Sequence, residues 1–276
     1  MPTYRGAAHL RAAIDSVLGQ TFADFELVVI DDDSPDETRE IVAAYADPRI
    51  RYLHNARNLG PQGNWNRCLE EARGRYFKLM PQDDLLHPEC LERQIAVLEA
   101  DSEHRLALVF GARDFVDSHG RKIFRRGAFG SQDIRIDGHH AIVSCVRKGT
   151  NLIGEPGNVL MRRELAQRLG KFDGTYGYMI DLDYWFRALQ EGDAYYLAQS
   201  LSSFRISQSS WSTAIGWRQS REFAAFARKY RALPDYRIGK LDLAIGISVA
   251  KINACMRQGV YWWLLRRGPA MGNPRG

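Results

Sequence analysis

The chain has 276 residues, of which 45% are hydrophobic and 26% are charged. This composition can bury a substantial core, so it predicts a soluble globular protein and excludes disordered and collagen-like chains. The formal net charge of +5 fits an anionic partner, which could be a phosphate-bearing substrate, a nucleic acid or an acidic membrane surface. Charge alone does not choose among them. Much of the positive excess lies late in the chain, whereas the first hundred residues carry many acids.

The four cysteines lie far apart and form no CxxC pair or Cys/His cluster. The sequence therefore indicates neither a disulfide framework nor a zinc site, and reduced thiols are expected. No signal peptide is visible, and the longest apolar run, Leu243 to Ala250, falls far below the roughly 20 residues of a membrane span. We therefore expect a cytoplasmic protein that is soluble or at most peripheral at the inner face of the membrane.

In the first half of the chain, the spacing of apolar residues alternates between that of helices and that of strands. Residues 10–18 have apolar side chains at helical spacing, and residues 25–30 form an apolar run broken only by Glu26, as in a strand buried on both faces. Further elements are predicted in the order of a helix opened by a capping box at Ser34 to Glu37, a strand at 50–53, a helix around 65–72, a strand at 76–80, a helix at 88–98 and a strand at 106–110. This alternation implies βαβ units and a mainly parallel sheet.

The second half is less regular. A hairpin strand is predicted at 122–124, a helix at 182–189, a short strand at 195–197 and helices beyond residue 212. The fold class is therefore α/β, with a Rossmann-like, doubly wound mixed sheet, helices on both faces and a C-terminal helical extension. We expect a domain at 1–212, with a nucleotide-binding half at about 1–111 and an acceptor half at about 112–212, followed by the extension at 213–276.

The start of the chain is unusual for such a fold. A doubly wound sheet normally begins with its central strand, but Met1 to Tyr4 run directly into the first helix. We expect the first central strand to be missing from the chain and the true start codon to lie upstream. Without that strand the nucleotide pocket would lose its floor, and activity would be weak or absent.

Three acidic groups follow predicted strands or open a helix: Asp31 to Asp33, Asp83 with Asp84, and Asp181 with Asp183. In open α/β sheets ligands bind outside the carboxyl ends of the strands. Carboxylates gathered there repel one another unless a cation compensates, and Mg²⁺ and Mn²⁺ prefer oxygen ligands together with substrate phosphates. Acids before a helix are also common N-caps, so each group has a purely structural alternative.

At this point the chain resembles the inverting family 2 glycosyltransferases of GT-A fold, from Pro2 to about Gln208. The order and spacing of several motifs carry the resemblance: "PTY" at 2–4, "SVLGQTFADFELVVIDDDSPDET" at 16–38, "NLGPQGNWNRCLEEARGRYFKLMPQDDLLHPECL" at 58–91, "IGEPGNVLMRR" at 153–163, and "GKFD" with "IDLDYWFRAL" between 170 and 189.

The resemblance implies a nucleotide-binding set in the first half. Asp32 would accept a hydrogen bond from the base, most often uracil, and Asp31 would support its turn. The remaining residues of this set line the nucleotide pocket or lie near the nucleoside: Pro2, Thr3, Tyr4, Asn58 and Gly60.

The resemblance also implies a metal site that binds Mn²⁺ or Mg²⁺. Asp83 falls at the last position of the family's DxD motif, and Asp84 follows it. Pro81 occupies the first position, so one of the two acids is absent. Coordination would then depend more on diphosphate oxygens and water.

Asp181 matches the family's catalytic base, although Ile180 replaces the glutamate that usually precedes it. An inverting transfer needs one carboxylate to take the acceptor's proton, while the metal stabilises the departing diphosphate. Asp181 could also simply cap its helix.

The acceptor side would include Glu155, Trp185 and Arg187, although an aromatic at helical spacing such as Trp185 is usually core. The family often has a histidine in an "FRxH" context, where this chain has Ser207. Arg205 or Gln208 could substitute for that histidine.

The last helical stretch combines an amphipathic pattern at 241–252 with an aromatic and basic cluster at 261–267. It could rest on an anionic membrane, or cover the domain's own core or a dimer partner. The second alternative ranks slightly higher.

The sequence therefore predicts an enzyme, a glycosyltransferase that moves a sugar from a nucleotide-diphosphate donor, such as a UDP-sugar, to a saccharide or lipid-linked acceptor in polysaccharide or glycoconjugate assembly. No nucleic-acid partner is expected, and the oligomeric state is open. A nucleotidyltransferase would ordinarily show a glycine-rich phosphate loop near the N-terminus, which is absent. A catalytically inactive sugar-nucleotide-binding or scaffold protein of the same fold remains the alternative.

Overall fold

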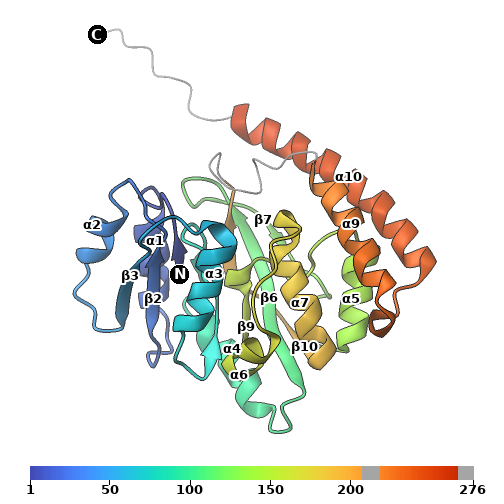
Figure 1. Ribbon diagram of the computed structural model, residues 1–276, viewed down its shortest axis with the longest axis horizontal. Coiled ribbons are helices and arrows are strands. Elements are labelled where there is room, and N and C mark those ends of the chain that lie inside the picture. The colour runs from blue at the N-terminus through green and yellow to red at the C-terminus, as the bar shows by residue number, and fades with distance from the viewer. Residues whose placement is uncertain (207–217, 267–276) are drawn as a thin grey trace.

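The computed structural model describes residues 1–206 and 218–266. The chain begins with a parallel sheet in the order β1-β2-β3, which alternates with three helices. These elements are β1 (Pro2–Thr3), α1 (Leu10–Leu18), β2 (Leu27–Asp31), α2 (Thr38–Ala43), β3 (Ile50–His54) and α3 (Gly60–Glu71). In Figure 1 this part forms one end of the molecule.

A larger mixed sheet follows, in the order β4-β9-β6-β10-β5, with β7 paired to β6 and β8 paired to β10. Its central strands β6 and β10 are parallel, and the other pairs are antiparallel. The strands are β4 (Tyr76–Phe77), β5 (Leu85–Leu86), β6 (Leu106–Val116), β7 (Lys122–Arg126), β8 (Ile134–Ile136), β9 (Val159–Arg162) and β10 (Asp193–Arg205).

Helices accompany this larger sheet, and α5, α9 and α10 lie at the end of the molecule opposite the first sheet (Figure 1). The helices are α4 (Cys90–Ala100), α5 (Gly138–Arg147), α6 (Arg163–Leu169), α7 (Ile180–Glu191), α9 (Arg218–Ala232) and α10 (Lys240–Arg266), with 3-10 turns η1 (Pro156–Asn158), η2 (Gly177–Met179) and η3 (Pro234–Tyr236).

Strand β6 separates two hydrophobic cores. All of its residues are buried. Leu108 and Phe110 belong to a core shared with α5, α7 and α9, whereas Leu106 and Val109 belong to a core shared with α1 and α4. A strand covered on both faces has a continuous apolar run, which is the pattern seen in residues 106–112. The predicted α/β class with helices on both faces is confirmed.

The first strand differs from its sequence-based expectation. Pro2–Thr3 form β1, which pairs in parallel with β2. The amino group of Met1 donates to the Val28 carbonyl at 2.6 Å, and Asp32 N donates to the Thr3 carbonyl at 2.8 Å. The segment expected to run directly into a helix therefore contributes strand residues to the edge of the nucleotide-binding half.

Other helices and strands begin or end at residues that differ from the predicted ones, for local reasons. Helix α2 begins at Thr38, whose amide and hydroxyl both donate to Asp36, so the predicted capping box at Ser34 does not open this helix. Strands β6 and β10 are longer than predicted because each continues past its apolar run into polar residues.

The C-terminal helices pack on the rest of the chain. Phe223, Phe226 and Tyr230 of α9 lie in the same core as α7. A Cβ atom on Gly246 of α10 would lie 2.0 Å from the Val146 carbonyl oxygen, so α10 approaches α5 as closely as backbones allow. The inner side of these helices thus covers the domain's own core. The division at residue 212 stays a prediction, and none of the described helices is long and apolar enough to cross a membrane.

Candidate active site

A pocket of about 230 Å³ collects carboxylates from three distant parts of the chain. Asp83 and Asp84 come from the turn between β4 and β5, Glu155 precedes η1, and Asp181 lies in the first turn of α7. Aromatic side chains from five segments form much of the remaining wall: Trp65, Phe115, Tyr178, Phe204 and Phe223. The structure therefore brings together the predicted base, the predicted metal-binding acids and one predicted acceptor-side residue.

Asp181 is held in place by two donors. Asn151 Nδ2 donates to its Oδ2 atom at 2.9 Å, and the Leu182 amide donates to its Oδ1 atom at 2.7 Å. Burial, and then the negative charge of Glu155, raise the pKa of Asp181 to about 7. A carboxyl group whose pKa lies near neutrality can both accept and release a proton, which suits general base catalysis.

Glu155 is fixed by a buried cation. The Nε atom of Arg113 in β6 lies 2.6 Å from Glu155 Oε2, and this guanidinium also donates to the carbonyls of Asn151 and Leu152. Gly154 has φ of +109°, and a Cβ atom there would lie 2.8 Å from the Arg113 guanidinium. This turn therefore requires glycine. Arg113 organises the loop that presents both Glu155 and Asn151 to the pocket.

The turn that carries Asp83 and Asp84 is anchored to the end of β10. Arg205 N donates to Asp84 Oδ1 at 3.1 Å, and Arg205 Nε donates to the Asp83 carbonyl at 2.8 Å. Burial raises the pKa of Asp83. Burial, the charge of Asp83 and the charge of Glu155 raise the pKa of Asp84 well above its usual value. The charged forms of these two carboxyl groups are thus disfavoured where they stand, because the nearby donors do not fully compensate their burial.

A divalent cation would relieve this repulsion. Among residues 1–206 and the described C-terminal helices, no group of three His, Cys, Asp or Glu side chains is arranged to hold a metal ion. Asp83 and Asp84 supply hard oxygen ligands, and Mg²⁺ commonly takes one or two carboxylates together with substrate phosphates. These residues therefore fit an ion that arrives with a diphosphate, rather than an ion enclosed by protein alone.

The predicted nucleotide residues gather at a second place, the carboxyl edge of the first sheet. Thr3 pairs with Asp31, and Asn58 Nδ2 donates to the Asp32 carbonyl at 3.0 Å. The Asp32 carboxylate accepts from Asn55 Nδ2 and the Leu59 amide, whereas Asp31 accepts from the Ser34 amide and the Tyr52 hydroxyl. Gly60 has φ of +73° and opens α3. Pro2 is half-buried and Tyr4 is exposed at the same edge.

One amide side chain joins the nucleotide edge to the acidic turn. Gln82 Oε1 accepts from the Tyr4 amide at 2.8 Å, and Gln82 Nε2 donates to the Tyr4 carbonyl at 2.9 Å. Because Gln82 precedes Asp83, this pair of hydrogen bonds holds the end of β1 beside the carboxylates. The two predicted half-sites are therefore neighbours.

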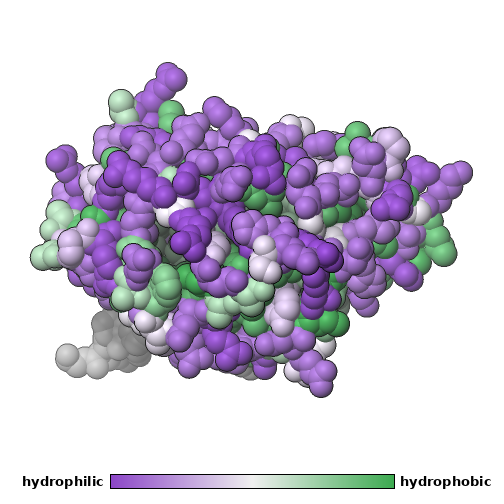
Figure 2. All heavy atoms as spheres, turned by 90° about the horizontal axis from the view of Figure 1, so that it is seen from below, coloured by the Kyte–Doolittle hydropathy of each residue, from purple (hydrophilic) through white to green (hydrophobic). Residues whose placement is uncertain are grey.

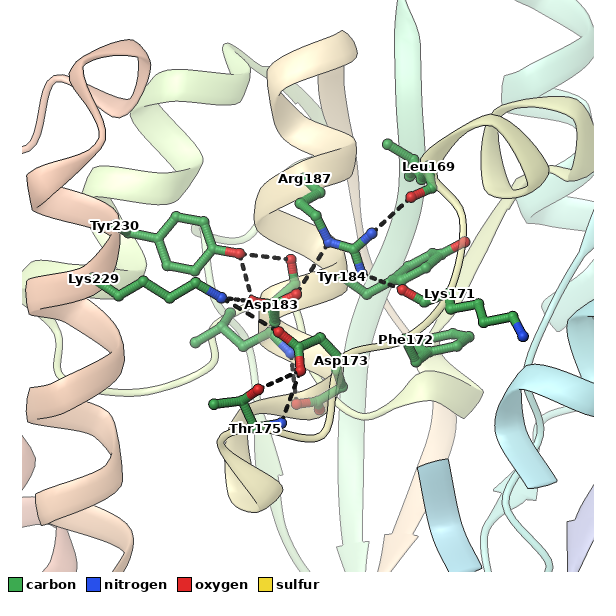
Figure 3. A network of polar contacts seen from close by, with 12 residues as sticks. Leu169, Lys171, Phe172, Asp173, Thr175, Asp183, Tyr184, Arg187, Lys229 and Tyr230 are labelled. Carbon is green, nitrogen blue, oxygen red and sulfur yellow. Dashed lines mark hydrogen bonds and ion pairs between the residues drawn. The ribbon is translucent and has the colours of Figure 1, made fainter. Parts of the chain in front are cut away.

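Two predicted acceptor-side residues do not line the pocket. Trp185 is buried, and its Nε1 atom donates to the Gly154 carbonyl at 3.0 Å, so it supports the Glu155 turn from behind. Arg187 donates to Asp183 and to the carbonyls of Leu169 and Lys171 (Figure 3). Its guanidinium is thus used to fix the segment that follows α6.

Figure 3 also shows how α9 is attached to α7. Asp183 is buried and accepts from the Tyr230 hydroxyl at 2.6 Å and from Lys229 Nζ at 3.1 Å. Lys229 also lies 3.5 Å from Asp173. Asp183 therefore has a structural role, although the sequence placed it in the same acidic group as Asp181.

Sequence reasoning missed several residues that shape the pocket: Gln82, Arg113, Arg126, Asn151, Gln219 and Phe223. Arg113 had a signal, because a cation inside an apolar strand run must find a buried partner. Asn151 and Gln82 act through contacts with distant segments, for which the sequence offers no local pattern. Gln208 and Ser207 lie outside the described residues.

Comparisons with known proteins agree with this arrangement. The sequence model of glycosyl transferase family 2 matches residues 1–170. The uncharacterized glycosyltransferase RT0329 of Rickettsia typhi is 29% identical over 206 residues, which are 75% of this chain and 62% of the relative. The chain therefore spans less than two thirds of that relative's length. WfgD of Escherichia coli, named as a UDP-Glc:α-D-GlcNAc-diphosphoundecaprenol β-1,3-glucosyltransferase, is 34% identical over 119 residues, covering 43% of this chain and 46% of WfgD.

A solved structure confirms the fold. S. aureus TarS, residues 1–349, in complex with UDP-GlcNAc superposes with a TM-score of 0.66 at 18% identity, covering 93% of this chain and 71% of the TarS chain. At this identity the likeness concerns the fold alone, which is the GT-A type predicted from the motifs. The family match over more than half of the chain confirms the predicted family as well, and the chain belongs to glycosyl transferase family 2.

Proposed function

We propose that this chain catalyses the inverting transfer of a sugar from a nucleotide-diphosphate donor to an acceptor hydroxyl, in polysaccharide or glycoconjugate assembly. One observation carries the proposal: Asp181, whose pKa is raised to about 7, faces the same pocket as Asp83 and Asp84. Inverting chemistry needs one base on the acceptor side and one centre of positive charge at the leaving group. The pocket supplies a carboxylate for the first and ligands for the second.

A uridine donor is the choice best supported. A TarS complex contains UDP-GlcNAc, and WfgD is named for UDP-Glc. We propose that Asp32 faces the base and that Pro2, Thr3, Tyr4, Asp31, Asn58 and Gly60 form the nucleoside side of the site. The Gln82 contact to Tyr4 would then set where the diphosphate reaches Asp83.

In the proposed reaction Asp181 accepts the proton of the acceptor hydroxyl as that oxygen attacks the anomeric carbon. Asn151 keeps the Asp181 carboxylate oriented, and Glu155 keeps it basic enough to act. Asp83 and Asp84 would hold Mn²⁺ or Mg²⁺, which when bound offsets the charge of the leaving diphosphate. Trp65 and Phe115 offer apolar faces against which a sugar ring can pack.

We place the acceptor, a saccharide or a lipid-linked saccharide, on the side of Glu155. Trp185 and Arg187 then act on that side only indirectly, by fixing the Gly154 turn and the segment after α6. A cytoplasmic location, with peripheral contact at the inner face of the membrane, is part of the proposal.

The proposal is tested by release of UDP from a panel of UDP-sugars by the purified full chain, with Mn²⁺ or with EDTA. We expect turnover with at least one donor, and chelation should lower it on the order of 10²-fold, because the ion offsets charge on the leaving group. Asp83→Asn should show a similar loss at fixed Mn²⁺, whereas the exposed Asp24→Asn should match wild type. Donor binding by calorimetry without turnover would instead favour the inactive, sugar-nucleotide-binding alternative.

The pH profile should report Asp181. A general base works in its deprotonated form, so kcat/KM should rise as pH increases through about 7 and level off above it. In Glu155→Gln the rise of kcat/KM on the acidic side of the pH profile, here called the acid limb, should move to lower pH. The reason is that a negative charge that raises the pKa of Asp181 is removed. The exposed Glu164→Gln in α6 is the matched control and should leave the limb in place.

Glu155→Gln also removes the carboxylate that pairs with Arg113, so its melting temperature should be measured alongside. The limb position does not depend on how much enzyme is folded, since it is read from the shape of the profile. An unshifted limb in a folded Glu155→Gln protein would contradict the proposed coupling.

A further inference from the structure

Helix α10 has two apolar sides, but among the described residues (1–206 and 218–266) only one of them is covered. Gly246, Ala250 and Ala254 are buried on the inner side, against the neighbouring helices. On the outer side Leu241, Ile252 and Met256 are 72%, 57% and 58% exposed, more than any other large apolar side chain among the described residues. Isolated exposed apolar side chains are ordinary, but a row of them on one helix marks a contact surface.

These residues form a continuous line along the helix. Leu241, Ile245, Ser248, Ile252 and Met256, here called the outer stripe, follow one another at intervals of three or four residues, the spacing of one helix face. Ser248 is the polar member, and its hydroxyl donates to the Ala244 carbonyl at 3.1 Å. Because its donor is satisfied within the helix, Ser248 can enter an apolar environment at little penalty.

The charge around the outer stripe is strongly positive. Residues 218–266 contain ten Lys or Arg and three Asp or Glu, a formal net charge of +7. Lys240 and Lys251 are exposed on α10, whereas Asp242, an acid of the same helix, lies 3.3 Å from Arg147. A second copy of this region would bring like charges together, whereas an anionic surface would be attracted.

The residue pattern of α10 points to a lipid surface rather than a membrane crossing. None of the described helices is long and apolar enough to span a bilayer. A helix that is apolar on two sides, as α10 is, can pack one side on its own domain and present the other, flanked by cations, to an anionic interface. The sequence of α10 continues with Tyr261, Trp262 and Trp263, residue types enriched at membrane–water boundaries. In Figure 2 hydrophobic atoms are visible at the right-hand edge, the end at which α10 begins in Figure 1, as well as at the left-hand edge and near the centre of this mostly hydrophilic face.

We propose that α10 docks on an anionic lipid surface, with the outer stripe at the headgroup–acyl boundary and Lys240 and Lys251 beside lipid phosphates. Ala250 of the same helix lines the pocket that holds Asp181. Docking would therefore hold this pocket close to the lipid surface. The docking gives the membrane contact of the proposed function a defined surface and rests on that part of it, but vesicle binding is measured without turnover, so it can fail or hold independently of the proposed sugar transfer.

The test is co-sedimentation of the purified full chain with vesicles of phosphatidylcholine alone or of phosphatidylcholine with phosphatidylglycerol. Wild type should bind the anionic vesicles, and high salt should release it. The triple variant L241Q/I252Q/M256Q should partition about tenfold less into the same vesicles, because the apolar contribution is lost. The control Ile134→Gln, at an exposed position of β8 that is 47% accessible, should bind like wild type.

All three substituted side chains are exposed, so the triple variant should keep its circular dichroism spectrum and melting temperature. K240E/K251E offers an independent variant and should also bind less. The proposal is overturned if wild type does not prefer anionic vesicles, or if a folded triple variant binds them as wild type does. It is also overturned if the outer stripe proves to join two copies, with wild type dimeric, the triple variant monomeric and vesicle binding equal.

Discussion

Replacing Asp181 by asparagine should lower kcat about 10³-fold while leaving donor binding within a few-fold of wild type, because general base catalysis supplies roughly 10²–10⁴-fold. Asparagine keeps the shape of the side chain but cannot accept the proton of the acceptor. Turnover of a donor identified in the UDP-sugar panel, together with donor affinity from calorimetry, measures both quantities.

Two controls make the Asp181 result specific. Asp24→Asn changes an exposed carboxylate of the same type and should behave as wild type. Asn151→Ala removes the donor to Asp181 Oδ2 and should lower kcat less than Asp181→Asn, since the carboxylate remains. If Asp181→Asn kept wild-type turnover, the base would have to be another group, and the proposed mechanism would be wrong.

Replacing Asp183 by alanine should destabilise the protein strongly. Its side chain is 4% exposed and meets Arg187, Lys229 and Tyr230. Removing one member of a buried ionic group typically lowers the free energy of unfolding by about 3–5 kcal/mol. Because Lys229 is 36% exposed, solvent screening places the expected loss at the lower end of this range, about 3 kcal/mol. For a chain of this size the melting temperature should then fall by roughly 6–12 °C.

Asp173→Ala is the matched control for this prediction. Asp173 pairs with the same lysine, but its side chain is 41% exposed, so its loss should lower the free energy of unfolding by less than about 1 kcal/mol. Thermal unfolding followed by circular dichroism distinguishes the two variants. Equal melting temperatures for Asp183→Ala and wild type would show that α9 is held mainly by its aromatic contacts.

The sequence predicted best those helices and strands whose apolar residues show the full helical or strand spacing without reference to a distant packing partner. Helix α1 and strand β2 needed only local spacing to be recognised, and their predicted positions agree closely with those in the structure. The region around 125–173 could not be assigned, although it contains α5 and β9. Part of the buried face of helix α5 is covered by α10, which lies about a hundred residues away in sequence.

The residues of the candidate site likewise fall into those that the sequence could predict and those that it could not. Motif spacing was enough to select Asp83, Asp84, Glu155 and Asp181, which the structure brings into one pocket. The groups that tune them were not predictable from spacing. Arg113 comes from β6 and Asn151 from the loop after α5, and each acts through contacts made only in three dimensions. Trp185 and Arg187 share a helix with Asp181 but point to other neighbours.

The paired hydrogen bonds between Gln82 and the Tyr4 backbone have a geometrical consequence. They make the Gln82 side chain a spacer of fixed length between the exit of β1 and the aspartate turn. The distance between a nucleoside bound on one side of that spacer and a sugar bound on the other would then be fixed by the length of this one side chain. A ligand of the wrong length between its two ends would fail to satisfy both at once.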